Sequence, residues 1–546
     1  MFKNHPRGLP ILFFTEMWER FGFYLMVGIF TLYMIDTTTG GRGWSNAKAA
    51  DIYGTYMALI YLTPFVGGLL ADRVLGYRKA ILIGGVLMGC GYIGLAFPGD
   101  MAFWLSLFVI IIGNGLFKPN ISTLVGNLYS TEEYKPYKDS GFNIFYMGIN
   151  IGAFVCNFVA AYLRNQFGWG YAFAAAGIGM FIGVIWFLTG QKHVRSADVL
   201  KPPSPHDMPW KKVLAIVFVP ALIFGAIGWF IPGSLFGSDS NDAFLFAAVP
   251  IVIYLISLWW RALKEDKSPI AALLVVFAVA IFYWAIYFQN GTALTFWANS
   301  YTNRNLPAAI EPVAQAMGAV QTVDTTPRDV PKLDPRGRAM TDAQGRVITE
   351  MGVDLYFRNL PKNERPAAGR QLKLLSPEIF QSVNPFWVVV LTPVIVGIFG
   401  ALRRHGKEPT TPGKIGLGLF VMSLTMLIMV GAVFATHNGL EKCSPWWLVA
   451  TYLSTTVGEL CISPMGLSLV SKLSPARFTA LMMGGWFLTL SIGNKLAGAL
   501  AGMWDLYSYK QYFFLVNFAV TMLGAILIFL LLRWLKRVMK EHMGGS

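Results

Sequence analysis

The 546-residue sequence predicts an all-α integral membrane protein, and three observations lead to that fold class. Hydrophobic residues make up 55% of the chain and charged residues only 13%, whereas soluble domains carry about 25% charge. The apolar residues gather in blocks of about 20 residues or more, which is long enough for a helix to cross a bilayer. Lysine and arginine concentrate on alternate connections between these blocks. A soluble enzyme is thereby excluded.

Blocks bounded by charge, glycine or proline predict fourteen helices, and their even number places both chain ends on one side. The predicted helices span 10–36, 48–71, 78–97, 101–129, 139–163, 170–190, 211–231, 243–262, 269–300, 377–402, 413–435, 446–471, 477–503 and 510–536. No small-residue cleavage site follows the first apolar segment, so we expect a retained helix rather than a removed signal peptide.

The basic residues orient the helices. With the N-terminus inside, the short inner segments hold 25 lysines and arginines, and the short outer segments hold five. This asymmetry follows the positive-inside rule and predicts that both termini are cytoplasmic. Most of the net charge of +15 therefore reflects basic residues that orient the helices in the membrane. We expect no nucleic acid among the partners.

The order of the helices predicts two bundles. Removing the two helices after the longest inner loop leaves six before and six after, which indicates the major facilitator fold plus an extra two-helix hairpin. We divide the chain into 1–190 (N-terminal six-helix bundle), 191–268 (inner loop and inserted helix pair), 269–300 (first helix of the C-terminal bundle), 301–376 (extracytoplasmic insert) and 377–546 (the remaining five helices).

The insert is rich in proline, and we expect a mostly irregular loop there. The segment TDAQGRVIT (341–349) allows a small hairpin around Gln344 and Gly345. Ser376, Pro377 and Glu378 then predict a helix start, with a serine cap, proline in the first position and an acid in the first turn.

Five ionisable residues interrupt apolar helices, where each costs at least about 2.5–3.5 kcal/mol unless it faces a cavity or a partner. They are Glu16, Glu19, Arg20, Lys118 and Glu459. The first three lie on one stripe of TEMWERFGFY (15–24), and Lys118 lies at nearly the same depth on a helix that runs the other way. We expect a closed, nearly neutral cluster that couples to protons; a purely structural network is the alternative.

Glu459 lies near mid-membrane in VGELCISPMG (457–466) with no basic residue nearby in the sequence. It is either a protonated, hydrogen-bonded glutamate or an anchor for the cationic end of a substrate. Lys495 is the sixth intramembrane charge, about two turns from the outer end of its helix, and we expect its ammonium to reach the interface.

The sequence lacks the motifs that bind nucleotides or metals or supply a nucleophile. The sequence contains no phosphate-binding glycine loop, and its six histidines and four cysteines lack ligand or redox spacing. We therefore predict no enzyme, no metal and no cofactor. Polar or aromatic interruptions at Tyr61, Asn150, Gln289, Asn290, Asn384 and Trp486 are weaker signals, because each alone is more often a helix-packing contact.

Six segments carry a family resemblance. EMWERFGFY resembles the E-x-x-E-R-F motif of the proton-dependent oligopeptide transporters, the peptide transporter (POT) family, and FNIFYMGINIGAF (142–154) resembles its fifth-helix signature. GGLLADRVLGYRKAI, FKPNISTLVG, FQSVNPFWVVVLTPV and GELCISPMGLSLVSKLSP also follow its pattern. The resemblance covers nearly all of both halves. The extra helix pair is similar to that of bacterial members, whereas the insert is outside the common pattern.

The resemblance implies a role for each matching residue. Arg20 and Lys118 would receive the peptide carboxylate, and Glu16 and Glu19 would couple protons to them. Asn150, Asn384 and Glu459 would hold the peptide amino terminus, and Tyr24, Tyr61 and Trp486 would line side-chain pockets. Two positions depart from the family: Phe23 replaces a frequent tyrosine, and Phe288, before Gln289, replaces a frequent seventh-helix acid.

The implied function is a secondary active symporter that imports di- and tripeptides with protons by alternating access. It would act as a monomer in the bacterial cytoplasmic (inner) membrane. Two other interpretations stay open: a proton-coupled carrier of the same fold for nitrate, a drug or a modified amino acid, and a membrane receptor or scaffold that binds through residues 301–376.

Overall fold

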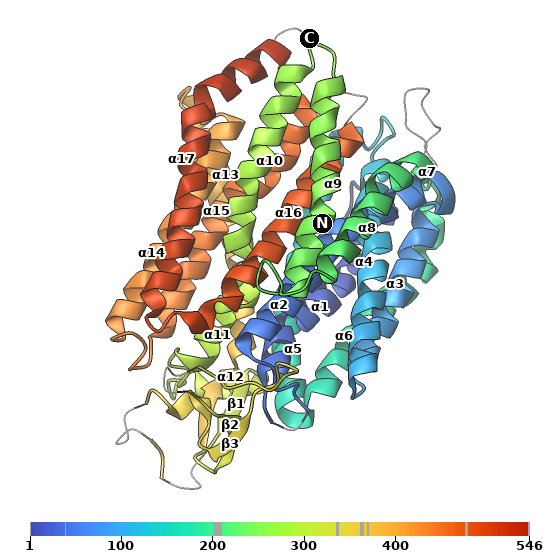
Figure 1. Ribbon diagram of the computed structural model, residues 1–546. Coiled ribbons are helices and arrows are strands. Elements are labelled where there is room, and N and C mark those ends of the chain that lie inside the picture. The colour runs from blue at the N-terminus through green and yellow to red at the C-terminus, as the bar shows by residue number, and fades with distance from the viewer. Residues whose placement is uncertain are drawn as a thin grey trace.

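The structure is a computed structural model that describes residues 2–38, 40–199, 210–334, 338–360, 365–367, 371–475 and 479–543. Long, roughly parallel helices form the body, and one small strand-containing unit caps one end (Figure 1). Ten helices of the described residues are long and apolar enough to cross a membrane. The predicted all-α membrane fold is confirmed. The first helix is not among the ten, because Glu16, Glu19 and Arg20 lower its mean hydropathy.

Six helices form the N-terminal half. They are α1 (Gly8–Ile35), α2 (Asn46–Leu70), α3 (Tyr77–Gly94), α4 (Asp100–Leu128), α5 (Lys138–Phe167) and α6 (Trp169–Gly190), with a π-helical turn, η1 (Ala71–Leu75), extending α2. Glycines let neighbouring helices approach closely: a Cβ on Gly84 of α3 would lie 2.6 Å from the carbonyl oxygen of Gly113 on α4. Small residues at such crossings are typical of membrane helices.

The inserted pair follows. Its first helix, predicted as one segment, is α7 (Trp210–Val213), a π-helical turn η5 (Leu214–Phe218) and α8 (Val219–Trp229); its second is α9 (Asp239–Arg261). Pro220 stands in the first turn of α8, where its missing N–H removes a helical hydrogen bond to the preceding turn. Residues 200–209, which belong to the predicted inner loop, lie outside the described residues.

The described residues of the C-terminal half also form six spans, two of them interrupted. Its elements are α10 (Lys267–Tyr287), η6 (Phe288–Gly291), α11 (Ala293–Ser300), η9 (Pro377–Ser382), α13 (Val383–Arg404), α14 (Thr411–Ala435), α15 (Pro445–Leu473), α16 (Thr479–Gly502) and α17 (Lys510–Met543). The predicted helix 269–300 is thus broken by the 3-10 turn η6. The predicted start of α16 at position 477 lies outside the described residues. Short 3-10 turns elsewhere are η2 (Lys135–Tyr137), η3 (Gln191–His193), η4 (Arg195–Ala197), η7 (Leu355–Phe357) and η11 (Trp504–Leu506).

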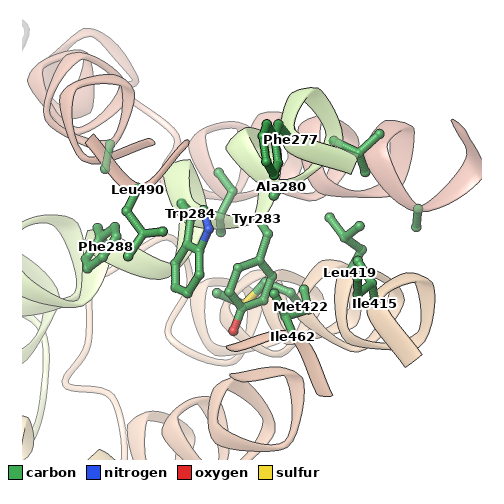
Figure 2. Packing of buried hydrophobic residues seen from close by; sticks show 14 of the residues in the cluster. Phe277, Ala280, Tyr283, Trp284, Phe288, Ile415, Leu419, Met422, Ile462 and Leu490 are labelled. Carbon is green, nitrogen blue, oxygen red and sulfur yellow. The ribbon is translucent and has the colours of Figure 1, made fainter. Parts of the chain in front are cut away.

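Each half has its own apolar core. In the C-terminal half, Tyr283 of α10 lies beside Met422 of α14 and Ile462 of α15, whereas Phe277 and Trp284 of α10 pack against Trp486 of α16 (Figure 2). A separate cluster joins α1 to α6 in the N-terminal half. Because most buried apolar contacts lie within a half, each half can hold its shape when the other moves.

The halves touch along two helix pairs, α2 with α16 and α5 with α13. A Cβ on Gly54 of α2 would lie 2.8 Å from the Cα of Gly498 on α16, so these helices nearly touch through their backbones. Thr31 donates to the carbonyl of Gly291 at 2.5 Å, and Asn157 donates to Ser382 at 3.0 Å.

All inter-half hydrogen bonds between described residues lie between the middle of the helices and the end that carries residues 301–376, which we call the insert end. The farthest from the insert, Ser491 to the carbonyl of Ala58 at 2.7 Å, is near mid-helix. The structure is therefore closed at the insert end.

The insert is more ordered than the predicted irregular loop. Its described residues form α12 (Glu311–Ala316) and four strands, with β1 (Val320–Val323) antiparallel to β4 (Leu372–Leu375) and β2 (Arg328–Pro331) antiparallel to β3 (Thr349–Gly352). Its small core includes Tyr356 and Phe357. The predicted turn at Gln344–Gly345 is confirmed, since Thr341 and Val347 bridge across it and Gly345 adopts φ +72°. A positive φ suits glycine.

The insert contacts both halves of the molecule, below the helices in Figure 1. Thr37, after α1, donates to the carbonyl of Asp329 at 2.8 Å, and Asn165 of α5 donates to that of Val320 at 3.0 Å. On the C-terminal half, the N–H of Asn303 donates to the carbonyl of Cys443 at 2.7 Å.

The predicted helix start after the insert is only partly as expected. The helical backbone begins at Pro377, but as the 3-10 turn η9 rather than an α-helix. The Ser376 side chain does not cap it and instead accepts a hydrogen bond from Asn165 at 2.8 Å. Glu378 is fully buried and faces a partner on the other half, described below.

Candidate functional site

The charged stripe of α1 is folded into one ion-pair group. The Arg20 guanidinium binds Glu19 through Nε and, at 2.6 Å, through Nη2, and its Nε lies 3.3 Å from Glu16 Oε1. The three residues are at most 3% exposed. Glu16 Oε2 is buried without a hydrogen-bond partner. Arg20 is thus compensated by two carboxylates of its own helix.

Lys118 stands apart from that group, unlike in the expected closed cluster of two acids and two bases. Within the described residues it forms no ion pair, and its Nζ lies 4.3 Å from the centroid of the Tyr61 ring. An aromatic face attracts an ammonium through its quadrupole. Lys118 still interacts electrostatically with Arg20, Glu19 and Glu16. The planar fork of Arg20 occupies both oxygens of Glu19, which leaves Lys118 available to another anion.

Glu459 on α15 has neutral partners. Asn384 Nδ2 donates to its Oε2 at 3.0 Å and also to Thr456 Oγ1 at 2.9 Å. The hydroxyl of Tyr287 at the end of α10 is hydrogen-bonded to the same carboxyl. Glu459 is therefore held by an amide and a phenol, and no basic side chain of the described chain pairs with it.

The depth of Asn384 is explained by η9. A helix start at Pro377 would place Asn384 about 10 Å along an α-helix, near the insert end. The 3-10 turn rises about 2 Å per residue instead of 1.5 Å, so the same residues reach about 13 Å. The 3-10 turn therefore moves Asn384 about 3 Å toward the depth of Glu459, to which it is hydrogen-bonded.

Tyr24 and Tyr61 lie between the two charged ends. Each interacts electrostatically with both Arg20 of the N-terminal half and Glu459 of the C-terminal half. The Arg20 guanidinium lies 5.9 Å from the Tyr24 ring centroid and 4.9 Å from that of Phe23. Phe23 thus contributes a ring face in place of the hydroxyl that a tyrosine would supply.

Phe288 joins the halves through its ring. It lies 5.4 Å from Tyr61 of α2 and stacks at 5.6 Å on Trp284. The next residue, Gln289, forms a reciprocal amide pair with Asn517 at 3.0 and 3.2 Å and is 2% exposed. At this position the chain offers an aromatic contact rather than a titratable group.

Two predicted site residues are engaged elsewhere. Trp486 is 2% exposed and packs against Phe277 and Trp284 inside the C-terminal core. Asn150 donates to the carbonyl of Tyr146, one turn earlier, at 2.9 Å. In the described part of the chain, no three His, Cys, Asp or Glu side chains gather as metal ligands would.

Sequence reasoning missed two tyrosines of this site, Tyr287 and Tyr146. The Tyr146 ring is 43% exposed although it lies on a central helix, and it interacts electrostatically with Glu459 and Tyr24. Tyr146 lies one turn before Asn150 on the same helix face, and this spacing could have identified Tyr146 as a candidate site residue. Tyr287 stands among aromatic residues in IFYWAIYFQ, and nothing in that run distinguishes it.

Two buried ion pairs join the halves near the insert end. Arg164 Nε of α5 lies 2.9 Å from Glu378 Oε1 of η9, and Lys495 Nζ of α16 lies 2.6 Å from Asp51 Oδ1 of α2. Lys495 is 2% exposed and also donates to Ser240 of the inserted helix α9 at 2.7 Å. The expectation that Lys495 reaches the interface is wrong, because a carboxylate lies within reach inside the protein.

A sequence model of the POT family matches residues 78–323 and 370–515. The chain belongs to the POT family. The unmatched residues 324–369 fall within the insert, which agrees with its place outside the common pattern. The chain is 33% identical to the uncharacterized transporter YclF of Bacillus subtilis (strain 168), over 99% of this chain and 96% of that protein. It is 29% identical to a di-/tripeptide transporter of Lactococcus lactis subsp. cremoris, over 96% and 95%.

Solved structures agree with this placement. The crystal structure of peptide transporter POT in complex with sulfate superposes with a TM-score of 0.76 at 28% identity, covering 99% of this chain and 97% of that one. A POT family transporter in complex with 5-aminolevulinic acid gives 0.76 at 25% identity, covering 98% of both. The family resemblance of the motifs is confirmed, and with it the prediction of a transporter rather than an enzyme.

Proposed function

We propose that this POT-family chain is a proton-coupled symporter that imports di- and tripeptides by alternating access. It would act as a monomer in the bacterial cytoplasmic membrane with both termini inside. The observation that carries the proposal is the layout of charge, with cations on the N-terminal half, an acid on the C-terminal half, and Tyr24 and Tyr61 between them. Relatives named as di-/tripeptide transporters support the same substrate class.

The proposed site reads both ends of a peptide. Lys118 and Arg20 receive the carboxylate, while Glu459, Asn384 and Asn150 hold the ammonium. Charge-assisted hydrogen bonds at both ends offset the desolvation of a zwitterion. Because these ends are common to all short peptides, affinity comes mainly from them. The side chains then meet the rings of Tyr24 and Tyr61, whose contacts are less specific, while Trp486 supports the site from the C-terminal core.

Proton coupling follows from the two carboxylates that neutralise the charge of Arg20. With Glu16 and Glu19 ionised, Arg20 is fully engaged. Protonation of either glutamate removes one negative charge and releases part of the guanidinium for the peptide carboxylate. The site with peptide and proton bound is then again close to neutral. This lowers the electrostatic cost of the conformational change that opens it to the other side of the membrane. No cofactor takes part; the proton gradient drives uptake.

Alternating access uses the two halves as bodies. We propose that the bundles 1–190 and 269–300 with 377–546 rock against each other about the central site. The asymmetry of lysine and arginine places the insert end outside. On this assignment the inter-half bonds of Thr31, Asn157, Arg164 and Lys495 belong to an outward-closed state and break when the carrier opens outward.

The test is uptake of labelled Ala-Ala into proteoliposomes with an inward proton gradient. We expect accumulation above equilibrium, abolished by collapsing the gradient, and competition by di- and tripeptides but not by peptides with both ends blocked. Equal uptake with and without the gradient would contradict the coupling. Failure of peptides to compete would contradict the substrate class.

A carrier of the same fold for another small substrate is the second candidate. A structural neighbour binds 5-aminolevulinic acid, which also has an amino and a carboxylate end. The same assay separates the candidates, because nitrate, a drug or a modified amino acid would then be transported while excess Ala-Ala leaves that transport unchanged.

A further inference from the structure

A cavity of about 500 Å³ lies at the insert end, apart from the central site. Its wall combines the end of α1, residues of α5 and α11, the start of α17 and the insert. The arginines that line it include Arg164, Arg304 and Arg328, and its aromatic residues include Trp169 and Tyr356. The cavity is of the size that small-molecule sites have, roughly 300–1,000 Å³.

Arg304, just after α11, is a buried cation without an acid. It is 3% exposed, and within the described chain it forms no ion pair. Its Nη1 donates to Gln321 Oε1 at 2.9 Å and to the carbonyl of Leu375 at 2.8 Å, which braces the insert, and its Nη2 lies 3.4 Å from the carbonyl of Asn299. Its Nε has no acceptor among protein atoms. The two Nη atoms of Arg304 thus hold the insert in place, whereas its Nε–H takes no part in that contact.

The surroundings of Arg304 hold both cations and acids, since the cavity wall also includes Asp36, Asp329, Asp354 and Asp505. Burial lowers the pKa of Arg304 to about 10. Lys442, whose Nζ lies 4.0 Å from the centroid of the same Tyr356 ring, has its pKa lowered to about 6 by burial and by the nearby charge of Arg304. By contrast Arg328, in the same cavity wall, is paired with Asp354 at 3.1 Å.

Arg164 is the second underused arginine of the wall. Its side chain is 10% exposed, and its ion pair with Glu378 joins the two halves at 2.9 Å. The pair is poorly aligned for hydrogen bonding: Arg164 Nε and Nη2 donate no hydrogen bond, and neither oxygen of Glu378 accepts one from the described residues. Arg304 interacts electrostatically with both Arg164 and Glu378, so the three groups form one local set.

We propose that Arg164 and Arg304 form an outer binding site for a carboxylate, and that an incoming carboxylate replaces Glu378 beside Arg164 and thereby loosens the closed insert end. The identification of the ligand as the free carboxyl end of a short peptide rests on the proposed function. The site itself is defined by carboxylate chemistry.

The energetics favour such an exchange. A guanidinium binds a carboxylate best with two parallel N–H···O bonds, and the present pair makes none of them. A mobile carboxylate is free to adopt that geometry, and the unused Nε of Arg304, which is buried while the insert end is closed, offers it a second donor as the pair of Arg164 and Glu378 opens. Opening of the halves then returns the fully buried Glu378 carboxylate to water, which removes its desolvation penalty.

The test follows opening rather than transport. Ser382, 2% exposed, donates to the carbonyl of Phe154 at 2.8 Å across the halves, so a Ser382→Cys reporter is protected while the insert end is closed. Cys90 is exposed and is first replaced by serine. The readout is the rate at which a membrane-impermeant maleimide labels the reporter in right-side-out vesicles.

We expect external Ala-Ala to speed labelling about tenfold, which corresponds to about 1.4 kcal/mol, and Ala-Ala amide to leave it unchanged. Arg304→Gln should remove the response, and Arg304→Lys should keep part of it. The matched control is Arg338→Gln, which removes the same charge from the insert at a residue paired with Asp334 and should leave the response intact. An unchanged response in Arg304→Gln, or an equal response to the amide, would overturn the proposal.

Two further arms separate this site from the proposed function. In Lys118→Ala, which lacks the central carboxylate partner, the response to Ala-Ala should persist although uptake is lost. If Lys118→Ala removes the response and Arg304→Gln keeps it, the peptide acts from the central site and the outer site is overturned. Acetate is the peptide-independent probe. If it speeds labelling through Arg304 in a chain that transports no peptide, the outer site stands while the proposed function fails.

Discussion

The two ends of the central site compensate charge in different ways. On the N-terminal half, Arg20 is bound by two carboxylates of its own helix, with Lys118 beside them over an aromatic ring. On the C-terminal half, Glu459 has only the dipoles of Asn384 and Tyr287. Ion pairs within one helix form and dissolve with the protonation of their acids. A carboxylate held by neutral donors keeps its attraction for a cation.

We propose that this difference gives the two ends distinct tasks. On this proposal the cationic end changes its available charge when a proton arrives and couples uptake to protons, and the acidic end offers a constant partner for an ammonium and anchors it. Variants at the two ends should therefore fail in different ways, and the following predictions run from the largest expected effect to the smallest.

Lys118→Ala should give the largest effect. Removing a buried charge from a carboxylate site costs about 2–5 kcal/mol, so gradient-driven Ala-Ala uptake should fall at least about thirtyfold. The measurement is initial uptake at a fixed inward proton gradient. Lys373→Ala, at an exposed ion pair of the insert, is the control and should be unaffected. Undiminished accumulation in Lys118→Ala would show that the cationic end does not couple peptide uptake to protons.

Glu459→Gln should weaken the anchor without abolishing exchange. A hydrogen bond to a charged group contributes about 1.5–3 kcal/mol, so the Ala-Ala concentration for half-maximal counterflow should rise about 10- to 100-fold. Glu459→Asp keeps the negative charge, so its half-maximal concentration should rise less than that of Glu459→Gln. An unchanged half-maximal concentration would show that the ammonium is held elsewhere.

Tyr287→Phe tests whether the neutral donors position the acid. One neutral hydrogen bond contributes about 0.5–1.5 kcal/mol, so half-maximal counterflow should shift roughly two- to tenfold. The shift should disappear when Glu459 is already glutamine, because Tyr287 acts through that carboxylate. An equal shift in both backgrounds would mean that Tyr287 serves only the packing of α10.

Lys442 extends the comparison to a buried cation outside the helices, and its effect on transport should be the smallest. Its pKa is about 6 when the insert is docked, against 10.5 for a free lysine, because burial disfavours the charged form. Between these values the undocked state binds more protons, so docking should strengthen as pH rises above 6, by at most about 1.4 kcal/mol per pH unit. Below pH 6 the lysine is protonated in both states, so the full free-energy cost of burying its charge opposes docking.

Amide hydrogen exchange at Asn303 and Cys443 measures that docking, because their N–H groups donate to Cys443 and Tyr301 across the junction. After correction for intrinsic exchange, protection should increase from pH 6 to pH 8 in the native chain. Lys442→Met should flatten the slope, while Lys373→Met keeps it. A slope that survives Lys442→Met would assign the pH dependence to another group.

The helices were predictable because hydropathy is a local property of the chain. Of their breaks, the one at Leu214–Phe218 has a local signal in Pro220, whereas no proline marks the one at Phe288–Gly291. The charged stripe of α1 was visible from residue spacing alone. In contrast, the pairing of Lys495 with Asp51 joins residues 444 positions apart, and no spacing rule reaches that far. The expected cluster is looser than predicted, because Arg20 forms the ion pairs with Glu16 and Glu19 while Lys118 interacts with them only electrostatically.

The insert was the least predictable region. Its strand pairs bring Val320 beside Leu375, and its contacts with α5 and with the loop after α1 depend on where the halves lie. Only the turn at Gly345, which has a local sequence signal, could be read in advance.

A crossed competition experiment tests the central claim most directly. Free Ala-Ala, N-acetylated Ala-Ala and Ala-Ala amide compete for counterflow in the native chain, in Lys118→Ala and in Glu459→Gln. We predict that Lys118→Ala no longer prefers the free peptide over the amide, and that Glu459→Gln no longer prefers it over the acetylated peptide, with each variant keeping the other preference. If both variants lose both preferences equally, or neither changes, the two-ended site is contradicted.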